Sequence, residues 1–288
     1  MLKIKFYRFL WHISVYALCF LMMAVTCAAQ DNAKMKPEEI VAKHLAAIGT
    51  PEMLASVSSR IIAGKSQARD VKATITTVAG QSVLASTKDQ SLLKMKFNVV
   101  DASDYSREEI IFDGKKVNAP FITESQRSAL GSFLFSYSEI VKQGLFGGSL
   151  NATWALLDAK SKISKFIYEG KEKISGKEVY VLRCVPRGGS ALTIKLYFDA
   201  QTFQHVRTTY YQVITSPITT ADQGLVSETR YKLEEDFSAY KKISGLTLPT
   251  NYKINYTIET PSRLNQFEWL LKFSQFTYNQ ELKSELFQ

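Results

Sequence analysis

Cysteine is scarce in this sequence, with three residues in 288. Cys19 and Cys27 lie in the first 29 residues, so a chain cleaved after residue 29 keeps only Cys184. A single cysteine forms no internal disulfide, which excludes a disulfide framework. The spacings Cys-x-x-Cys and His-x-x-x-His, which indicate metal sites, are missing as well. We therefore expect a hydrophobic core to stabilise the chain, without a metal ion.

Catalytic motifs are also lacking. Gly131-Ser132 and Gly148-Ser149 have no second glycine to complete the Gly-x-Ser-x-Gly elbow of serine hydrolases. Gly64-Lys65-Ser66 resembles the end of a phosphate-binding loop, but Ser59 stands where that motif begins with glycine, and the segment alternates like a strand. The sequence thus predicts a protein that is not an enzyme and holds no cofactor.

A few residues of chemical interest remain. Glu234, Glu235 and Asp236 follow one another, and successive residues of a strand point to opposite faces. They indicate a solvated strand end rather than a carboxylate pair, although a hydrolase that uses them stays open as an alternative. His44 and His205 are far apart in the chain, and we expect both to be structural.

Charge of one sign is not concentrated anywhere in the chain. The net charge is +9, and loss of Lys3, Lys5 and Arg8 with the first 29 residues leaves 33 basic and 27 acidic residues, or +6. Because these charges are interspersed, they are typical of a solvated surface. Nucleic acid is not expected as a partner, whereas transient contact with an anionic membrane surface is compatible with the balance.

The N-terminus has the three parts of a secretory signal peptide. Basic residues precede an apolar stretch at residues 13–25, and Cys27-Ala28-Ala29 forms a small-residue cleavage site. We predict that residues 1–29 are removed and that residues 30–288 form a single domain in the periplasm or outer cell envelope. A retained membrane anchor and a lipid attached to Cys27 are the alternatives.

Helices are predicted in three places. Residues 37–48 are amphipathic, with a possible further turn at 51–57, and residues 152–159 form a short helix. Between them, residues 124–145 predict a helix of about 18 to 20 residues with an aromatic face. Glycines then place Leu145 and Phe146 on a flexible, exposed loop. This helix is either ordinary core or a lid over a ligand cavity.

Strand patterns occupy most of the remaining sequence. Asp113-Gly114 predicts a tight hairpin, and residues 191–213 predict two strands joined at residues 199–202, with one apolar face. Strands do not alternate with helices along the chain, so a parallel sheet is disfavoured. The other predicted strands cover residues 60–68, 71–78, 81–86, 91–99, 107–112, 115–117, 165–169, 178–185, 227–236, 251–260 and 266–276.

The expected fold is α+β, mainly antiparallel β. It is a strongly curved sheet or incomplete β-barrel of about eleven strands, with helices covering the concave side, because large twisted sheets curl.

A family resemblance rests on several segments read together. The chain resembles exported bacterial proteins related to the LolA/LolB-type outer-membrane lipoprotein carriers. The segments that carry the resemblance are Glu38-Glu39-Ile40-Val41-Ala42-Lys43-His44-Leu45-Ala46-Ala47-Ile48-Gly49, Gly144-Leu145-Phe146-Gly147-Gly148, Leu196-Tyr197-Phe198-Asp199, Thr202-Phe203, Asp236-Phe237 and Ile243-Ser244-Gly245-Leu246-Thr247-Leu248-Pro249.

The resemblance implies an unclosed, helix-capped barrel around an apolar cavity that holds acyl chains. It predicts a non-enzymatic carrier or chaperone whose partner is a lipid or a lipidated protein. An envelope scaffold with a filled core and a protein-binding surface is the alternative. The residues predicted to line a ligand are Leu130, Phe133, Leu134, Tyr137, Val141, Leu145, Phe146, Leu192, Ile194, Leu196 and Phe198.

Overall fold

The computed structural model describes residues 35–71, 77–99, 105–122, 126–217 and 226–288. The chain divides into a unit of residues 1–36 and a unit of residues 37–288, and every helix and strand of the described residues belongs to the second unit. The predicted signal peptide lies outside the described residues. Most of the predicted strand at 71–78 does too, and Thr77 begins the next strand of the sheet.

Two helices open the folded unit. Helix α2 (Pro37–Ile48) has the predicted bounds and buries Ile40, Val41, His44 and Ile48 along one side. Helix α3 (Pro51–Ser56) follows directly, with Thr50 as its N-cap, whose side chain accepts a hydrogen bond from the backbone nitrogen of Met53 at 3.3 Å.

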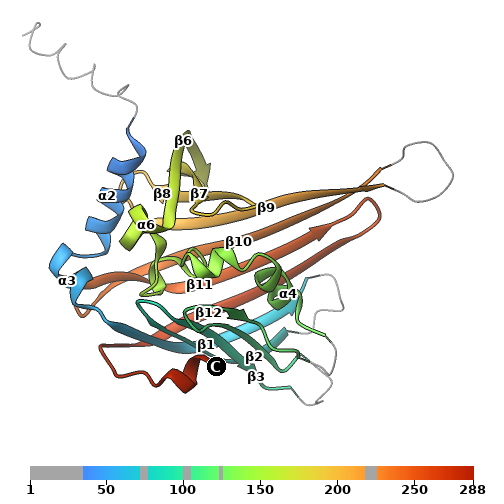
Figure 1. Ribbon diagram of the computed structural model, residues 1–288, viewed down its shortest axis with the longest axis horizontal. Helices are drawn as coiled ribbons and strands as arrows, with labels where there is room; N and C mark the ends of the chain where they lie inside the picture. Colours follow the sequence, from blue (N-terminus) through green and yellow to red (C-terminus); the bar gives the residue numbers. More distant parts are fainter. Residues whose placement is uncertain (1–34, 72–76, 100–104, 123–125, 218–225) are drawn as a thin grey trace, which may run out of the picture. The chain divides into compact units, whose positions relative to one another are not determined.

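One antiparallel sheet of twelve strands makes up most of the unit (Figure 1). Its order is β5-β4-β3-β2-β1-β12-β11-β10-β9-β8-β7-β6, so the edge strands β5 and β6 are not paired with each other and the barrel stays open. The predicted fold class is confirmed. The strands are β1 (Ser59–Asp70), β2 (Thr77–Thr87), β3 (Ser91–Phe97), β4 (Arg107–Phe112), β5 (Val117–Asn118), β6 (Ile163–Ile174), β7 (Lys177–Pro186), β8 (Thr193–Asp199), β9 (His205–Pro217), β10 (Val226–Ile243), β11 (Leu246–Glu259) and β12 (Leu264–Tyr278).

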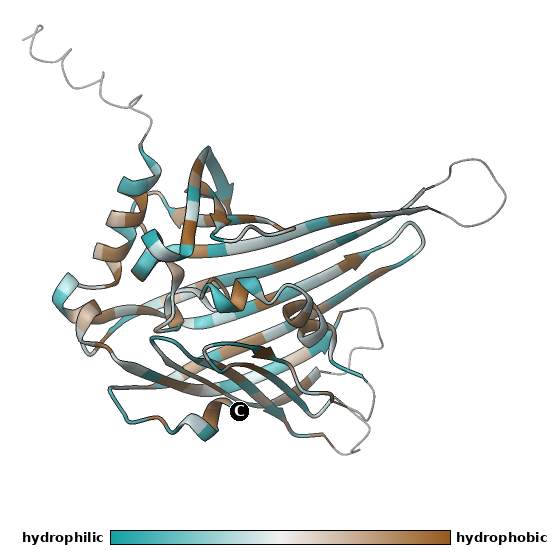
Figure 2. Ribbon diagram, in the orientation of Figure 1, coloured by the Kyte–Doolittle hydropathy of each residue, from teal (hydrophilic) through white to brown (hydrophobic). Residues whose placement is uncertain are grey.

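The register of the strands brings mainly apolar residues together on the inner face. Leu93 of β3 pairs with Ile110 of β4, and Ile254 of β11 pairs with Trp269 of β12. Apolar and polar residues alternate along the strands, as the hydropathy colours of Figure 2 show. This alternation is the local property that assigns each side chain to the interior or to solvent.

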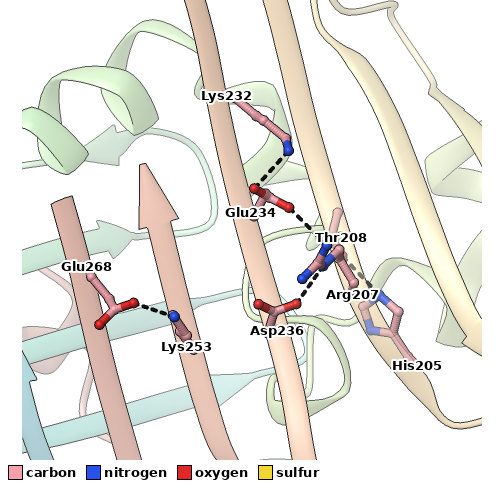
Figure 3. Close-up of polar contacts among 8 residues, drawn as sticks. All are labelled: His205, Arg207, Thr208, Lys232, Glu234, Asp236, Lys253 and Glu268. Atoms are coloured by element: carbon pink, nitrogen blue, oxygen red, sulfur yellow. Dashed lines mark hydrogen bonds and ion pairs between the residues drawn. The ribbon is translucent and has the colours of Figure 1, made fainter. Parts of the chain in front are cut away.

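The outer face of β9 to β12 carries ion pairs. Arg207 lies between two acids of β10, with Nη1 3.1 Å from Glu234 Oε1 and Nε 2.6 Å from Asp236 Oδ1 (Figure 3). Lys232 contacts Glu234 at 2.9 Å, and Lys253 pairs with Glu268. These ion pairs make the outer face of β9 to β12 polar, in agreement with the interspersed charges of the sequence.

The outer face of β2 to β4 is covered by the C-terminus. The 3-10 helix η3 (Ser284–Phe287) inserts Phe287, which is fully buried, against Ala85, Leu92 and Ile111. Residues near the C-terminus therefore complete a second, smaller core on the convex side.

The prediction of one long helix in the segment between β5 and β6 is wrong. It contains α4 (Ala129–Ser136), α5 (Glu139–Lys142), the 3-10 helices η1 (Gly148–Leu150) and η2 (Ala155–Asp158), and α6 (Ala159–Lys162). Helix α4 begins after Ser128 because that side chain accepts a hydrogen bond from Gly131 N at 2.7 Å. It ends at Tyr137, whose φ of −110° and ψ of 49° leave the helical region, in a Ser-Tyr-Ser sequence of modest helix propensity.

The prediction of an exposed loop at Leu145 and Phe146 is wrong. Both side chains are buried, with 0% and 5% exposed. Gly144 has φ +71°, and a Cβ there would lie 1.9 Å from the carbonyl oxygen of Thr153. The glycine therefore permits a tight turn that folds the loop back toward the sheet instead of leaving it mobile.

Candidate functional site

The predicted ligand-lining residues lie in the packed interior of the curved sheet. All are buried except Tyr137, which is half-buried. The ring of Phe133 on α4 lies 5.0 Å from that of Tyr256 on β11, and Phe146 lies 6.4 Å from Tyr252. None of these predicted residues lines any of three cavities found in the described part of the chain.

Glu235 is the first of two buried glutamates that attach the segment from Ser128 to Gly147 to the sheet. It projects inward from β10 and is fully buried. Its Oε1 accepts hydrogen bonds from Gly147 N at 2.6 Å and from the hydroxyl of Tyr252, and its Oε2 accepts one from Tyr210 at 2.6 Å. Burial raises the pKa of Glu235 to about 7, and the three hydrogen bonds oppose that rise.

The burial of Glu235 corrects the prediction of a solvated strand end at residues 234–236. Glu234 and Asp236 pair with Arg207 on the outer face, while Glu235 points inward between them, so the three acids form no common group. The sequence held a signal that was missed. Glu235 stands midway between Leu233 and Phe237, two residues from each, and residues at that spacing share one face of a strand.

Glu108 on β4 is the second such glutamate. Its Oε1 accepts a hydrogen bond from Ser128 Oγ at 2.7 Å, and Ser128 is the residue that caps α4. Its Oε2 accepts one from Tyr105, whose oxygen in turn accepts a hydrogen bond from Trp269 Nε1 at 2.9 Å. Burial raises the pKa of Glu108 to about 7. The two ends of the segment from Ser128 to Gly147 are thus each fixed by a buried carboxyl group.

A cavity of about 560 Å³ opens beside the start of α4, and we call it the α4 cavity. Its apolar wall includes Ala68, Phe267 and Trp269 from β1 and β12, and Ala129 from α4. Ser128 and Tyr105 also line it, so the hydrogen bonds of Glu108 lie next to it. The volume falls within the range of about 300 to 1,000 Å³ that is usual for ligand pockets.

The edge of the α4 cavity combines arginine with exposed aromatic rings. The guanidinium of Arg127 lies 4.3 Å from the ring centre of Phe121 and 4.0 Å from that of Phe135. Both rings are 45% exposed. Arg127 Nε donates to the carbonyl oxygen of Ala119 at 2.7 Å, and Arg107 donates to that of Phe121. Within the described ranges, neither arginine forms an ion pair with a carboxylate.

The two histidines of the described chain form an aromatic cluster in the core. His44 Nε2 accepts from Trp154 Nε1 at 3.1 Å while its Nδ1 lies 3.0 Å from the carbonyl oxygen of Phe203, so Nδ1 carries the proton. His205 stacks on Trp154 with 5.0 Å between ring centres. Burial lowers the pKa of His44 to about 4 and that of His205 well below its ordinary value. Both are neutral packing residues at physiological pH.

Three further findings concern the described residues only. No group of three or more His, Cys, Asp or Glu side chains in them could hold a metal ion. No helix among them combines the length and apolar character needed to cross a membrane. Cys184 is a free, buried thiol, and burial raises its pKa to about 12, so it is unreactive at neutral pH.

No family model and no curated protein matches the chain. Solved structures do match. A LolA superfamily protein from Nitrosomonas europaea is 14% identical, with 88% of this chain and 98% of that one covered and a TM-score of 0.48. The chain is similar to LolA superfamily proteins. A DUF1329 family protein from Desulfovibrio piger is 12% identical, covering 87% and 96% with a TM-score of 0.44.

A third similar structure is an outer membrane lipoprotein-sorting protein domain from Vibrio parahaemolyticus. It is 12% identical, with 86% of this chain and 94% of that one covered and a TM-score of 0.43. These likenesses, at 12% to 14% identity, concern the fold.

Proposed function

We propose that this protein is a non-enzymatic periplasmic carrier or chaperone that binds a lipid, or the acyl chains of a lipidated protein, in an apolar cavity. The observation that supports this most directly is the α4 cavity, which joins an apolar wall to a polar, arginine-containing edge. Such a combination suits an amphiphile, whose chain is buried while its head stays near solvent.

The energy of binding comes from apolar burial. Each methylene removed from water contributes about 0.8 kcal/mol, so about eight buried methylenes contribute about 6 kcal/mol before the cost of ordering the chain. A cavity open at one edge allows such a ligand to enter and leave without unfolding the sheet.

We propose that the eleven predicted lining residues contact the part of a ligand that reaches beyond the α4 cavity into the interior. Most of them lie on, or under, the segment from Ser128 to Gly147, which covers the inner face of β10 to β12 (Figure 1). If that segment acts as a lid, a longer acyl chain displaces it and contacts residues such as Phe133 on the lid and Leu196 on β8. The hydrogen bonds of Glu108 and Glu235 then set the free energy needed to open it.

Transient contact with a membrane surface is part of the proposed cycle. Phe121 and Phe135 are exposed large apolar side chains beside the cavity, and Arg127 and Arg107 add positive charge there. Aromatic and basic groups together favour the interface of an anionic bilayer.

Lipid that co-purifies with the protein tests the proposal. The full-length gene is expressed in its native envelope, and the processed protein is examined by native mass spectrometry and organic extraction. We expect a bound lipid, and we expect Ala129→Trp, which fills the α4 cavity, to reduce it. Ala200→Trp, in the β8–β9 turn and away from the cavities, is the matched control. A lipid-free wild-type protein contradicts the proposal.

A second candidate function is an envelope scaffold or adaptor. It is favoured by one observation, namely that Leu145 and Phe146 fold inward and pack the centre of the curved sheet. A scaffold predicts no uptake of a fluorescent fatty-acid probe by the wild-type protein. A carrier predicts uptake that Ala129→Trp reduces and Ala200→Trp does not.

A further inference from the structure

A second cavity, of about 730 Å³, lies at the opposite end of β1, and we call it the α2 cavity. Arg60 at the start of β1 lines it, whereas Arg69 near the end of β1 lines the α4 cavity. Nine residue-to-residue steps along the strand separate the two arginines by on the order of 30 Å. The walls of the α2 cavity are mainly apolar, with Leu45 from α2, Leu54 from α3 and Trp154 among them.

Arg60 is the unusual residue in this cavity, because its charge is buried without a counter-ion. Its side chain extends from the inner face of β1, and the residue is only 3% exposed. Nη1 donates to the carbonyl oxygens of Ser149 at 2.5 Å and Leu150 at 3.0 Å. Nε has no hydrogen-bond partner, and in the described part of the chain no carboxylate forms an ion pair with the guanidinium.

The surroundings of Arg60 do not neutralise it. Its guanidinium carbon lies 5.7 Å from the ring centre of Tyr278, whose hydroxyl is itself buried without a partner. Burial lowers the pKa of Arg60 only to about 10, so the group stays charged at neutral pH. The remaining charged residues of the lining are two lysines and two aspartates, which balance one another: Lys88, Lys162, Asp89 and Asp158.

A buried charge without an opposite charge costs several kcal/mol, even after the protein relaxes around it. Two carbonyl oxygens offset only part of that cost, because they are dipoles and not ions. An anion that enters the cavity supplies the missing charge and can accept a hydrogen bond from a guanidinium, whose planar fork fits carboxylate and phosphate groups.

We propose that the α2 cavity is a binding site for an anionic amphiphile, whose carboxylate or phosphate head pairs with Arg60 while its apolar chain lies along α2, α3 and Trp154. The site is separate from the α4 cavity and goes beyond the proposed carrier function. It gives the protein selectivity for negatively charged heads, which apolar burial alone does not provide.

Ligands of equal chain length and different head test the proposal in the wild-type protein. Dodecanoate, dodecyl phosphate and the neutral dodecyl maltoside are titrated calorimetrically into the mature chain below their micellar concentrations, beside inorganic phosphate. We expect an anionic ligand to bind at least about tenfold tighter than the neutral one, since a hydrogen bond to a charged group contributes about 1.5 to 3 kcal/mol. The stronger of the two anions identifies the head as carboxylate or phosphate.

Arg60→Met removes the charge and keeps a side chain of similar length. We expect this variant to lose the preference for anionic heads, while Arg230→Met, an exposed arginine on β10, keeps it. Ala129→Trp in the α4 cavity is expected to leave the preference unchanged. A wild-type preference that survives in Arg60→Met, or equal binding of all three amphiphiles by the wild type, overturns the proposal.

An NMR measurement covers the case in which Arg60→Met does not fold. In arginine-labelled wild-type protein, the Nε resonance of Arg60 is expected to shift on addition of dodecanoate or dodecyl phosphate and not with dodecyl maltoside. If the Nε resonance does not respond to either anion, Arg60 serves only to hold η1 and the proposal fails. The response of Arg60 does not depend on the α4 cavity, which Ala129→Trp tests, so the two proposals fail separately.

Discussion

The backbone nitrogen of Gly147 donates a hydrogen bond to Oε1 of Glu235 over 2.6 Å, in a part of the core where both residues are buried. The two residues are 88 positions apart in the chain. Together with the bond between Ser128 and Glu108, this contact fixes the segment that contains α4 and α5 at both of its ends. The stability of that segment therefore depends on the ionisation of two glutamates.

Replacing Glu235 with glutamine is expected to change how stability depends on pH. The pKa of Glu235 rises from 4.5 to about 7 on folding, so its contribution to stability is present below pH 4.5 and is lost as the pH rises through 7. A shift of this size corresponds to about 3 kcal/mol. Glutamine can accept the bonds from Gly147 and Tyr252 and donate one to Tyr210, but it does not titrate.

The measurement is the free energy of unfolding in urea at pH 4.5, 6 and 8, for wild type and Glu235→Gln. We expect the variant to gain stability relative to wild type as the pH rises. His44 titrates in the opposite sense over a similar range, with a pKa lowered to about 4, so the difference between the two proteins is the informative quantity. A difference that is constant with pH contradicts the prediction.

Ser128→Ala is expected to loosen the start of α4. The change removes the N-cap of the helix and the donor to Glu108, which leaves a buried carboxyl group with one bond fewer. We expect a loss of about 1 to 3 kcal/mol and faster amide exchange in α4. Ser138→Ala, at the N-cap of α5 where no side-chain bond forms, is the control and should change stability little. Equal effects of the two substitutions would falsify the role assigned to Ser128.

Gly144→Ala is expected to destabilise the protein severely. The residue has φ +71°, and an added Cβ would lie 1.9 Å from the carbonyl oxygen of Thr153, so the backbone itself must move. Gly188 has φ +90° and nothing within 4 Å of an added Cβ, which makes Gly188→Ala a control for the backbone strain alone. Thermal unfolding should show about 1 kcal/mol lost in the control and several kcal/mol in Gly144→Ala. Similar melting temperatures would show that the turn at Gly144 is not tightly packed.

Phe121→Ser combined with Phe135→Ser is expected to weaken binding to vesicles that contain anionic phospholipid. Both rings are 45% exposed and flank the guanidinium of Arg127, so their loss should leave the core intact. Co-sedimentation with vesicles measures the effect, and we expect at least about a tenfold weaker association because two rings no longer enter the bilayer interface. Leu286→Ser removes another exposed apolar side chain, 42% exposed, far along the chain from this surface. A loss of the same size in Leu286→Ser argues against a specific membrane-contacting edge.

The sequence alone determined most of the strands, the helix at residues 37–48 and the open antiparallel fold. These features follow from local rules, because a period-2 alternation assigns each side chain to one face whatever lies opposite it. The alternation in and just before β8 is an example. It predicts four buried side chains, and all four are buried: Leu192, Ile194, Leu196 and Phe198.

Only the tertiary structure decided which polar groups are buried and where the cavities lie. Glu235 is buried because Tyr210, Tyr252 and Gly147 converge on it from separate parts of the chain, and Arg60 because η1 closes over it. The long aromatic helix of the prediction is divided at Tyr137, and its glycine loop turns inward because Gly144 packs against Thr153. Such contacts join residues remote in sequence, so no local pattern contains them, and they determine where a ligand can bind.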